Sequence, residues 1–186
     1  LEPPLSGAML ILGAGAVLML VGGIHWAWVG GAVGAAATMM YTVLFVIGYN
    51  TSRITYWLDP WKDAQGKGYQ LAQSLLTIGS GGLLGVGLGK SRQKFLYLPE
   101  EHNDFIFAIV CEELGLIGAT VIMLLFAALI LRGFWIALHA RDRFGSLMVV
   151  GITTLVGLQT FLNIGVVTGL LPTTGISLPF FSYGGT

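Results

Sequence analysis

Between Lys90 and Asp104 the sequence contains charged side chains of the types that act together on an anionic substrate. Within these fifteen residues lie three cations, three carboxylates and a histidine: Lys90, Arg92, Lys94, Glu100, Glu101, Asp104 and His102. Such cations neutralise the charge of a phosphate group, and a carboxylate can accept a proton during a reaction. The same pattern also fits a solvated loop in which Asn103 or Asp104 caps the next helix, so both interpretations stand.

Two further carboxylates, Glu112 and Glu113, lie inside a long apolar stretch, where a charge is costly. In a regular helix that starts near Asp104, Glu112 falls about 80° and Glu113 about 180° around the axis from Asp104. At least one of them must therefore face protein or water rather than lipid. One interpretation makes them a proton relay or a counter-charge for Lys94 or Arg92. The other makes them buried partners of a cation on another helix, and both remain open.

The remaining reactive side chains do not form the pattern of a known catalytic or metal site. The three histidines, His25, His102 and His139, lack the spacing of metal ligands, and Cys111 has no charged base beside it. No phosphate-binding loop, dinucleotide-binding fingerprint or serine triad is present in the sequence. The glycine run over 79–89 can bring helices close together or leave room for a bulky lipid, and we expect close packing. These residues predict no metal site.

The composition indicates a membrane protein. Of 186 residues, 55% are hydrophobic and 10% are charged, with a mean hydropathy of +0.81, whereas soluble domains carry about 25% charged residues. High hydrophobicity with low net charge excludes intrinsic disorder. Nine basic residues balance nine acidic ones, so nothing indicates a nucleic-acid partner. A single cysteine excludes an internal disulfide.

Five apolar stretches are long enough to cross a bilayer, which takes about 20 residues. We predict an all-α, polytopic membrane protein with crossings at about 5–23, 27–49, 69–89, 105–131 and 145–166. Paired glycines and tryptophans over 22–28 suit a hairpin at the membrane interface. The proline and glycine residues of 167–186 predict a loop that re-enters the membrane.

Five crossings also predict the two sides of the membrane. On one side they place loops 50–68 and 132–143; on the other they place the 24–28 hairpin, loop 90–104 and the tail 167–186. The first side carries six Lys and Arg residues, and the second carries three. Short loops rich in Lys and Arg stay in the cytoplasm. We therefore predict that the first side is cytoplasmic and that the second is the outer face.

Several motifs resemble those of the SEDS family (shape, elongation, division and sporulation) of membrane proteins. They are YQLAQS at 69–74, GSGGLLGVGLG at 79–89, QK at 93–94, LPEEHNDFIFA at 98–108, EELG at 112–115, Asn163, and GLLPTTGISLPFFSYGGT at 169–186. Their details are closer to the FtsW and SpoVE type than to RodA. The resemblance implies a fold of about ten helices, of which this chain supplies the fifth to the ninth. Because the sequence starts at Leu1 and stops within a motif, we expect an internal piece of a longer protein.

SEDS proteins polymerise lipid II into peptidoglycan outside the bacterial cytoplasmic membrane, together with a class B penicillin-binding protein. The resemblance therefore implies a peptidoglycan glycosyltransferase of cell division, with lipid II, other divisome proteins and membrane lipid as partners. It makes Asp104 the catalytic carboxylate, which our hypothesis treats as a general base. Lys94 and Arg92, with a divalent cation such as Mg or Mn if one is bound, would offset charge on the leaving pyrophosphate. Further candidates for substrate binding are Gln73, Glu113 and Ser182.

Two other functions remain open. A lipid II flippase would also use intramembrane carboxylates such as Glu112 and Glu113, together with a roomy glycine-rich span. A non-catalytic divisome scaffold would use its loops only to bind a partner. The outer-face carboxylate beside three cations favours the glycosyltransferase, because glycosyl transfer from a pyrophosphate needs a base and charge neutralisation.

Overall fold

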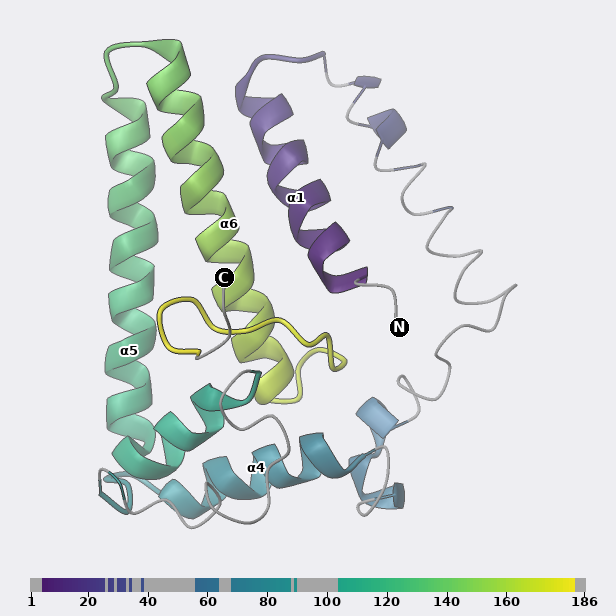
Figure 1. Ribbon diagram of the computed structural model, residues 1–186, viewed down its shortest axis with the longest axis vertical. Helices are drawn as coiled ribbons and strands as arrows, with labels where there is room; N and C mark the ends of the chain where they lie inside the picture. The colour runs from purple at the N-terminus through teal and green to yellow at the C-terminus, as the bar shows by residue number, and fades with distance from the viewer. Residues whose placement is uncertain are drawn as a thin grey trace.

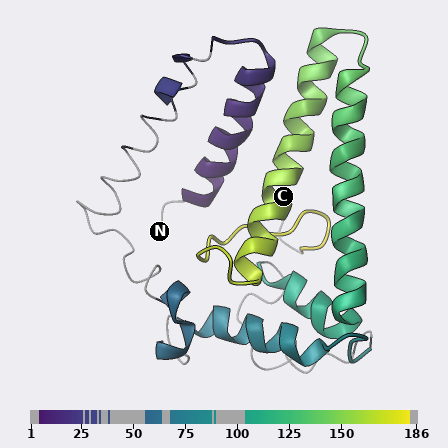
Figure 2. The same ribbon diagram turned by 180° about the vertical axis from the view of Figure 1, so that it is seen from behind.

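The computed structural model describes residues 5–25, 27–28, 30–32, 34, 38, 56–63, 68–87, 89 and 104–182, and within these residues all regular structure is helical. The main elements are α1 (Leu5–Val21), the 3-10 turn η2 (Pro60–Asp63), α4 (Tyr69–Gly81), α5 (Ile106–Leu138) and α6 (Arg143–Val167). Helices α1, α6 and most of α5 stand side by side, and α4 lies across the end of the α5–α6 pair (Figure 1; Figure 2).

Helices α5 and α6 form an antiparallel pair joined by a short turn, 139–142 (Figure 1). At 33 and 25 residues, both are long and apolar enough to cross a membrane. Asp142 fixes the start of α6, because its Oδ2 accepts a hydrogen bond from the N–H of Gly145 at 2.7 Å. Gly133 lets the two helices approach closely, since a Cβ at this position would overlap the side chain of Thr153.

Helix α1 packs against α6 and runs in the opposite direction. Gly13 of α1 lies against Leu158, and Gly151 of α6 lies against Leu18, so each helix offers a glycine to a leucine of the other. The 17 residues of α1 span about 25 Å. The turn that follows α1, at 22–25, lies at the same end of the molecule as the α5–α6 turn (Figure 1).

Helix α4 is shorter than the unbroken membrane crossing that the sequence predicts over 69–89. It ends at Gly81 after 13 residues, a length of about 20 Å, because Gly82 takes a φ of 55° and a ψ of −147°. Leu76 is exposed, whereas the residues on the packed side are buried: Leu71, Ala72, Ser74 and Thr77. An uncharged stretch has the same composition whether it crosses a bilayer or lies along it, so hydropathy does not distinguish the two.

Helix α5 is broken at Gly115, whose φ of 69° and ψ of −173° are not helical. The first part, 106–114, runs obliquely over α4 toward the foot of the second part, 116–138, which stands upright beside α6 (Figure 1). The upright part therefore begins after Gly115, inside the crossing predicted at 105–131, and continues past it to Leu138. The upright helix also takes up most of the predicted loop 132–143.

The break in α5 is closed by the turn that follows α4, and we call the two segments, 82–87 and 112–117, the clasp. In an unbroken helix, the N–H groups at 116 and 117 would donate to the carbonyls at 112 and 113. In the clasp each of these groups bonds across to the other segment, from N–H to carbonyl: Val86 to Glu112 at 3.0 Å, Gly87 to Glu113 at 3.1 Å, Leu116 to Gly82 at 2.9 Å and Ile117 to Leu83 at 3.3 Å. The broken helix therefore keeps its backbone satisfied, as an apolar environment requires.

This arrangement groups the segments at the two ends of the molecule differently from the five-crossing prediction. Trp57 Nε1 donates to the carbonyl of Gly169 at 2.9 Å, so the segment 56–63 lies at the end that holds the tail, not at the end of the α5–α6 turn. The turn at 22–25 lies at the same end of the molecule as the α5–α6 turn, away from the start of α5 (Figure 2). Both differences have one cause, because the prediction counts α4 as a crossing. The comparison of Lys and Arg counts assumes that crossing, so it no longer supports the choice of the cytoplasmic side.

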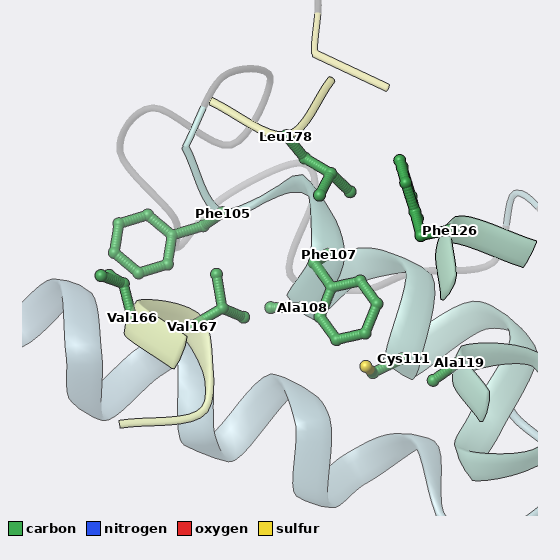
Figure 3. Close-up of a cluster of buried hydrophobic side chains, with 9 residues drawn as sticks. All are labelled: Phe105, Phe107, Ala108, Cys111, Ala119, Phe126, Val166, Val167 and Leu178. Carbon is green, nitrogen blue, oxygen red and sulfur yellow. The ribbon is translucent and has the colours of Figure 1, made fainter. Parts of the chain in front are cut away.

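The buried core lies where the oblique part of α5, the end of α6 and the tail meet. Its side chains are Phe105, Phe107, Ala108, Cys111, Ala119, Phe126, Val166, Val167 and Leu178 (Figure 3). Ser74 Oγ donates to the carbonyl of Val167 at 2.8 Å and so ties α4 to the end of α6. The tail returns along α5, where the rings of Phe180 and Phe181 lie 6.4 and 6.1 Å from that of Phe126.

Candidate active site

Asp104 lies immediately before α5, but it is not at the position from which an aspartate normally caps a helix. Phe105 occupies the N-cap position and makes no side-chain cap hydrogen bond. The Phe105 ring is buried beside Val166 and Val167 at the end of α6 (Figure 3). A buried neighbour therefore anchors the backbone next to Asp104, while the side chain of Asp104 stays half-buried.

Asn163 brings two distant segments together at Asp104. Its Nδ2 donates one hydrogen bond to the backbone carbonyl of Asp104 and another to that of Ile176, each at 2.7 Å. Asn163 lies on α6 and is 1% exposed. A single buried amide thus holds the start of α5 and the tail against the same helix.

The tail presents Gly175 to the carboxylate of Asp104. Gly175 has a φ of 68°, a conformation that favours glycine. A Cβ placed on Gly175 would lie 3.5 Å from Oδ2 of Asp104. The tail backbone therefore passes close to the carboxylate with no side chain of residue 175 between them.

Glu112 and Glu113 lie at the far end of the oblique part of α5. Glu113 is seven residues beyond Ile106, about 10 Å along the helix axis, so it stands apart from Asp104. Glu112 is 2% exposed and therefore meets protein rather than lipid, as the sequence predicts for at least one of the pair. Oε1 of Glu113 is buried and has no hydrogen-bond partner within the described ranges.

The other predicted substrate-binding residues are spread over several elements. Gln73 is half-buried on α4. Ser182 is half-buried near the end of the tail, where its N–H donates to the carbonyl of Leu178 at 3.2 Å. Arg92 and Lys94 lie outside the described residues, so their predicted role at the pyrophosphate stays a prediction.

The described residues contain no group of three His, Cys, Asp or Glu side chains that could hold a metal ion. Three such residues close to Asp104 in the sequence, Glu100, Glu101 and His102, lie outside those residues. A divalent cation at this site therefore stays a prediction.

Asn163 is the site residue whose role the reasoning from sequence misses. The sequence does indicate a bonded amide in this helix, because an amide inside a membrane helix is costly unless it is hydrogen-bonded. The stretch 145–166 contains two amides, Gln159 and Asn163. The sequence does not tell which segments they bond, since both partners of Asn163 are backbone carbonyls that any residue type can supply.

Comparison with known proteins places the chain among cell cycle proteins. The profile of the FtsW/RodA/SpoVE family, described as cell cycle protein, matches residues 1–186. The chain is 48% identical to stage V sporulation protein E of Bacillus subtilis, over 100% of this chain and 50% of that protein. It is 47% identical to the probable peptidoglycan glycosyltransferase FtsW of Geobacter metallireducens, over 97% of this chain and 48% of that protein. The chain spans about half the length of the curated relatives it matches.

Two solved structures share the fold. One is a peptidoglycan synthase complex described for its coordination of polymerization and crosslinking, with a TM-score of 0.75 and 29% identity over 98% of this chain and 51% of that one. The other is a variant of the rod shape determining protein RodA of Thermus thermophilus, with a TM-score of 0.58 and 28% identity over 98% and 44%. With the profile match over the whole chain, these likenesses show that the chain belongs to the FtsW/RodA/SpoVE (SEDS) family of membrane proteins and is of the FtsW and SpoVE type.

Proposed function

We propose that the protein containing this chain is a peptidoglycan glycosyltransferase that polymerises lipid II during cell division. The observation that carries the proposal is the carboxylate of Asp104, half-buried beside Gly175 and fixed through its own backbone by Asn163. A general base must be held within hydrogen-bonding reach of the proton it removes. The names of the FtsW relatives, probable peptidoglycan glycosyltransferases, support the reaction class.

In the proposed reaction, Asp104 removes the proton from the 4-hydroxyl of the GlcNAc on one lipid II molecule. The hydroxyl oxygen attacks the anomeric carbon of the growing chain, and a new glycosidic bond forms with inversion. The bond from that carbon to undecaprenyl pyrophosphate breaks at the same time. Lys94 and Arg92 offset the charge on the leaving pyrophosphate, with a divalent cation if one is bound.

The surface around this end of the molecule suits a polyprenyl substrate. Large apolar side chains are exposed on the turn after α4 and on the tail: Leu83, Leu84, Leu170 and Phe180. Polyprenyl tails of the two substrates would lie against these side chains, with Gln73, Glu113 and Ser182 contributing polar contacts. A class B penicillin-binding protein is the proposed partner, and the peptidoglycan synthase complex with the same fold supports that choice.

We place the protein in the bacterial cytoplasmic membrane, with Asp104 at the outer face. The turn between α5 and α6 is short and is flanked by Arg132, Arg141 and Arg143, as in the basic connections that membrane proteins keep in the cytoplasm. The opposite end of the pair, with α4, Asp104 and the tail, is then outside.

Cysteine labelling tests this orientation. In a Cys111→Ala background, we expect Trp61→Cys to react with a membrane-impermeant maleimide on intact spheroplasts, because Trp61 is 56% exposed at the Asp104 end. Ala140→Cys, in the α5–α6 turn, is expected to react only after permeabilisation. Five crossings would put both positions on the same side, and the reverse pattern of labelling would contradict the outer-face assignment.

The reaction itself is tested with the whole protein, co-purified with its penicillin-binding protein and given lipid II. We expect glycan polymer on a gel. A flippase would instead translocate labelled lipid II across proteoliposomes without forming polymer. A scaffold would do neither, while still binding its partner. Either of the last two results would overturn the proposal.

A further inference from the structure

Asn163 makes an unusual pair of hydrogen bonds for a membrane helix, because both its partners come from outside that helix. Its two N–H groups go to the carbonyls of Asp104 and Ile176, which lie 59 and 13 residues away in the sequence. Carbonyl oxygens only accept hydrogen bonds, so the atom that faces them must be the amide nitrogen. Both donors of the amide are then in use.

The surroundings of Asn163 leave little freedom to the amide. The side chain is 1% exposed, and its Oδ1 is buried without a hydrogen-bond partner in the described part of the chain. A buried polar atom without a partner is unfavourable, so what holds the amide in this orientation is the pair of hydrogen bonds that Nδ2 donates.

We propose that Asn163 is a positioning residue, which sets the place of the Asp104 carboxylate relative to the Gly175 loop by holding both backbones on α6. The proposal rests on the proposed function, in which Asp104 is the base. A Cβ on Gly175 would lie 3.5 Å from Oδ2 of Asp104, so a shift of this loop changes the space directly beside the carboxylate. A shift of about 1 Å between the two segments can cost about 100-fold in rate.

Residue types of similar size cannot replace the amide. Aspartate has the same shape, but it lacks the NH2 group and would put a carboxylate oxygen against two carbonyls. Glutamine keeps the NH2 group but moves it by one methylene. We therefore expect Asn163→Asp to lose the clamp and Asn163→Gln to hold it at a displaced position.

The experiment uses the whole protein with its penicillin-binding protein and compares Asn163→Asp and Asn163→Gln with a matched control. Ser74→Ala is that control, because Ser74 is also fully buried and donates one side-chain hydrogen bond to a backbone carbonyl, that of Val167. We expect kcat for lipid II polymerisation to fall about 100-fold in Asn163→Asp and about 10-fold in Asn163→Gln, with KM within about 2-fold of wild type. Ser74→Ala should keep kcat within about 2-fold of wild type.

Amide hydrogen exchange supplies a second measurement that does not depend on activity. In Asn163→Asp, and to a smaller extent in Asn163→Gln, exchange should rise at 105–108 and 173–178 and stay at the wild-type level along 116–138. Uniformly faster exchange, or a kcat equal to that of Ser74→Ala, would overturn the proposal. If Asn163→Asp does not fold, Asn163→Gln decides by the same two measurements.

The variant Asp104→Asn separates the positioning role of Asn163 from the proposed function. If Asp104→Asn polymerises lipid II as wild type does, Asp104 is not the base and the catalytic role of Asn163 falls with it. If Asp104→Asn is inactive while both Asn163 variants keep wild-type kcat, only the positioning role of Asn163 is overturned.

Discussion

Replacement of Gly115 by alanine is expected to destabilise the protein by about 4 kcal/mol or more, which is exceptional for one methyl group. Gly115 has a φ of 69°, and a residue with a Cβ pays roughly 1–2 kcal/mol for this conformation. The new Cβ would also lie 2.5 Å from the carbonyl oxygen and 2.7 Å from the carbonyl carbon of Leu83, and it would overlap the backbone nitrogen of Gly85. These are backbone atoms of the clasp, so they cannot rotate away as a side chain can.

The clash forces the two segments of the clasp apart and therefore weakens or breaks the four hydrogen bonds between them. Backbone groups that lose partners in an apolar environment cost several kcal/mol each. Gly85→Ala should have a similar effect, because its Cβ would lie 2.6 Å from the carbonyl carbon of Glu113 and from the nitrogen of Gly115. The two substitutions strain the same contact, so we expect the effects of a double variant to be less than additive.

Thermal unfolding of the purified whole protein in detergent measures these effects. For a whole protein about twice as long as this chain, a loss of 4 kcal/mol corresponds to a fall in Tm of about 5 °C. Gly79→Ala is the matched control, because Gly79 lies within α4 and a Cβ there meets no atom of the described residues within 4 Å. Gly89→Ala isolates the conformational cost, since Gly89 has a φ of 74° and a Cβ there also has no neighbour within 4 Å in the described part of the chain. A Tm for Gly115→Ala equal to that of Gly79→Ala would show that the clasp does not hold α5.

The clasp also explains how far the sequence predicts the fold. The sequence places a crossing at 145–166, and α6 runs over Arg143–Val167, because a straight helix in an apolar environment depends on composition and length. The turn at 82–87 and the break at Gly115 depend instead on contacts between two segments far apart in the chain. Hydropathy averages over such glycines, so it predicts unbroken helices at both places.

The candidate site likewise combines features that a local sequence pattern predicts with features that depend on contacts between distant segments. Asp104 is proposed from its motif and from the charges near it, because a local pattern carries both. Asn163 bonds to Asp104 and Ile176 through their backbone carbonyls. Every residue type has such a carbonyl, so the identities of these two residues do not reveal the contact. The different rotations of Glu112 and Glu113 around a helix predict that at least one of them meets protein or water. The 2% exposure of Glu112 agrees, since that argument needs only the local helix.

Asp104→Asn is expected to reduce polymerisation of lipid II at least about 100-fold, because a general base contributes about 10²–10⁴-fold to a rate. Asparagine has the size and shape of aspartate, but it cannot accept the proton of the attacking hydroxyl. The backbone carbonyl that Asn163 holds belongs to residue 104 whatever its side chain. The variant should therefore fold and bind its penicillin-binding protein as wild type does.

The matched control is Asp142→Asn, which makes the same chemical change at the other end of the molecule. Asp142 accepts the hydrogen bond of Gly145 at the start of α6, and asparagine caps a helix about as well as aspartate. We expect this variant to polymerise lipid II at the wild-type rate in the gel assay. If Asp104→Asn also forms wild-type amounts of polymer, the base lies elsewhere. Glu113 is then the next carboxylate to replace, because its buried Oε1 has no hydrogen-bond partner within the described residues.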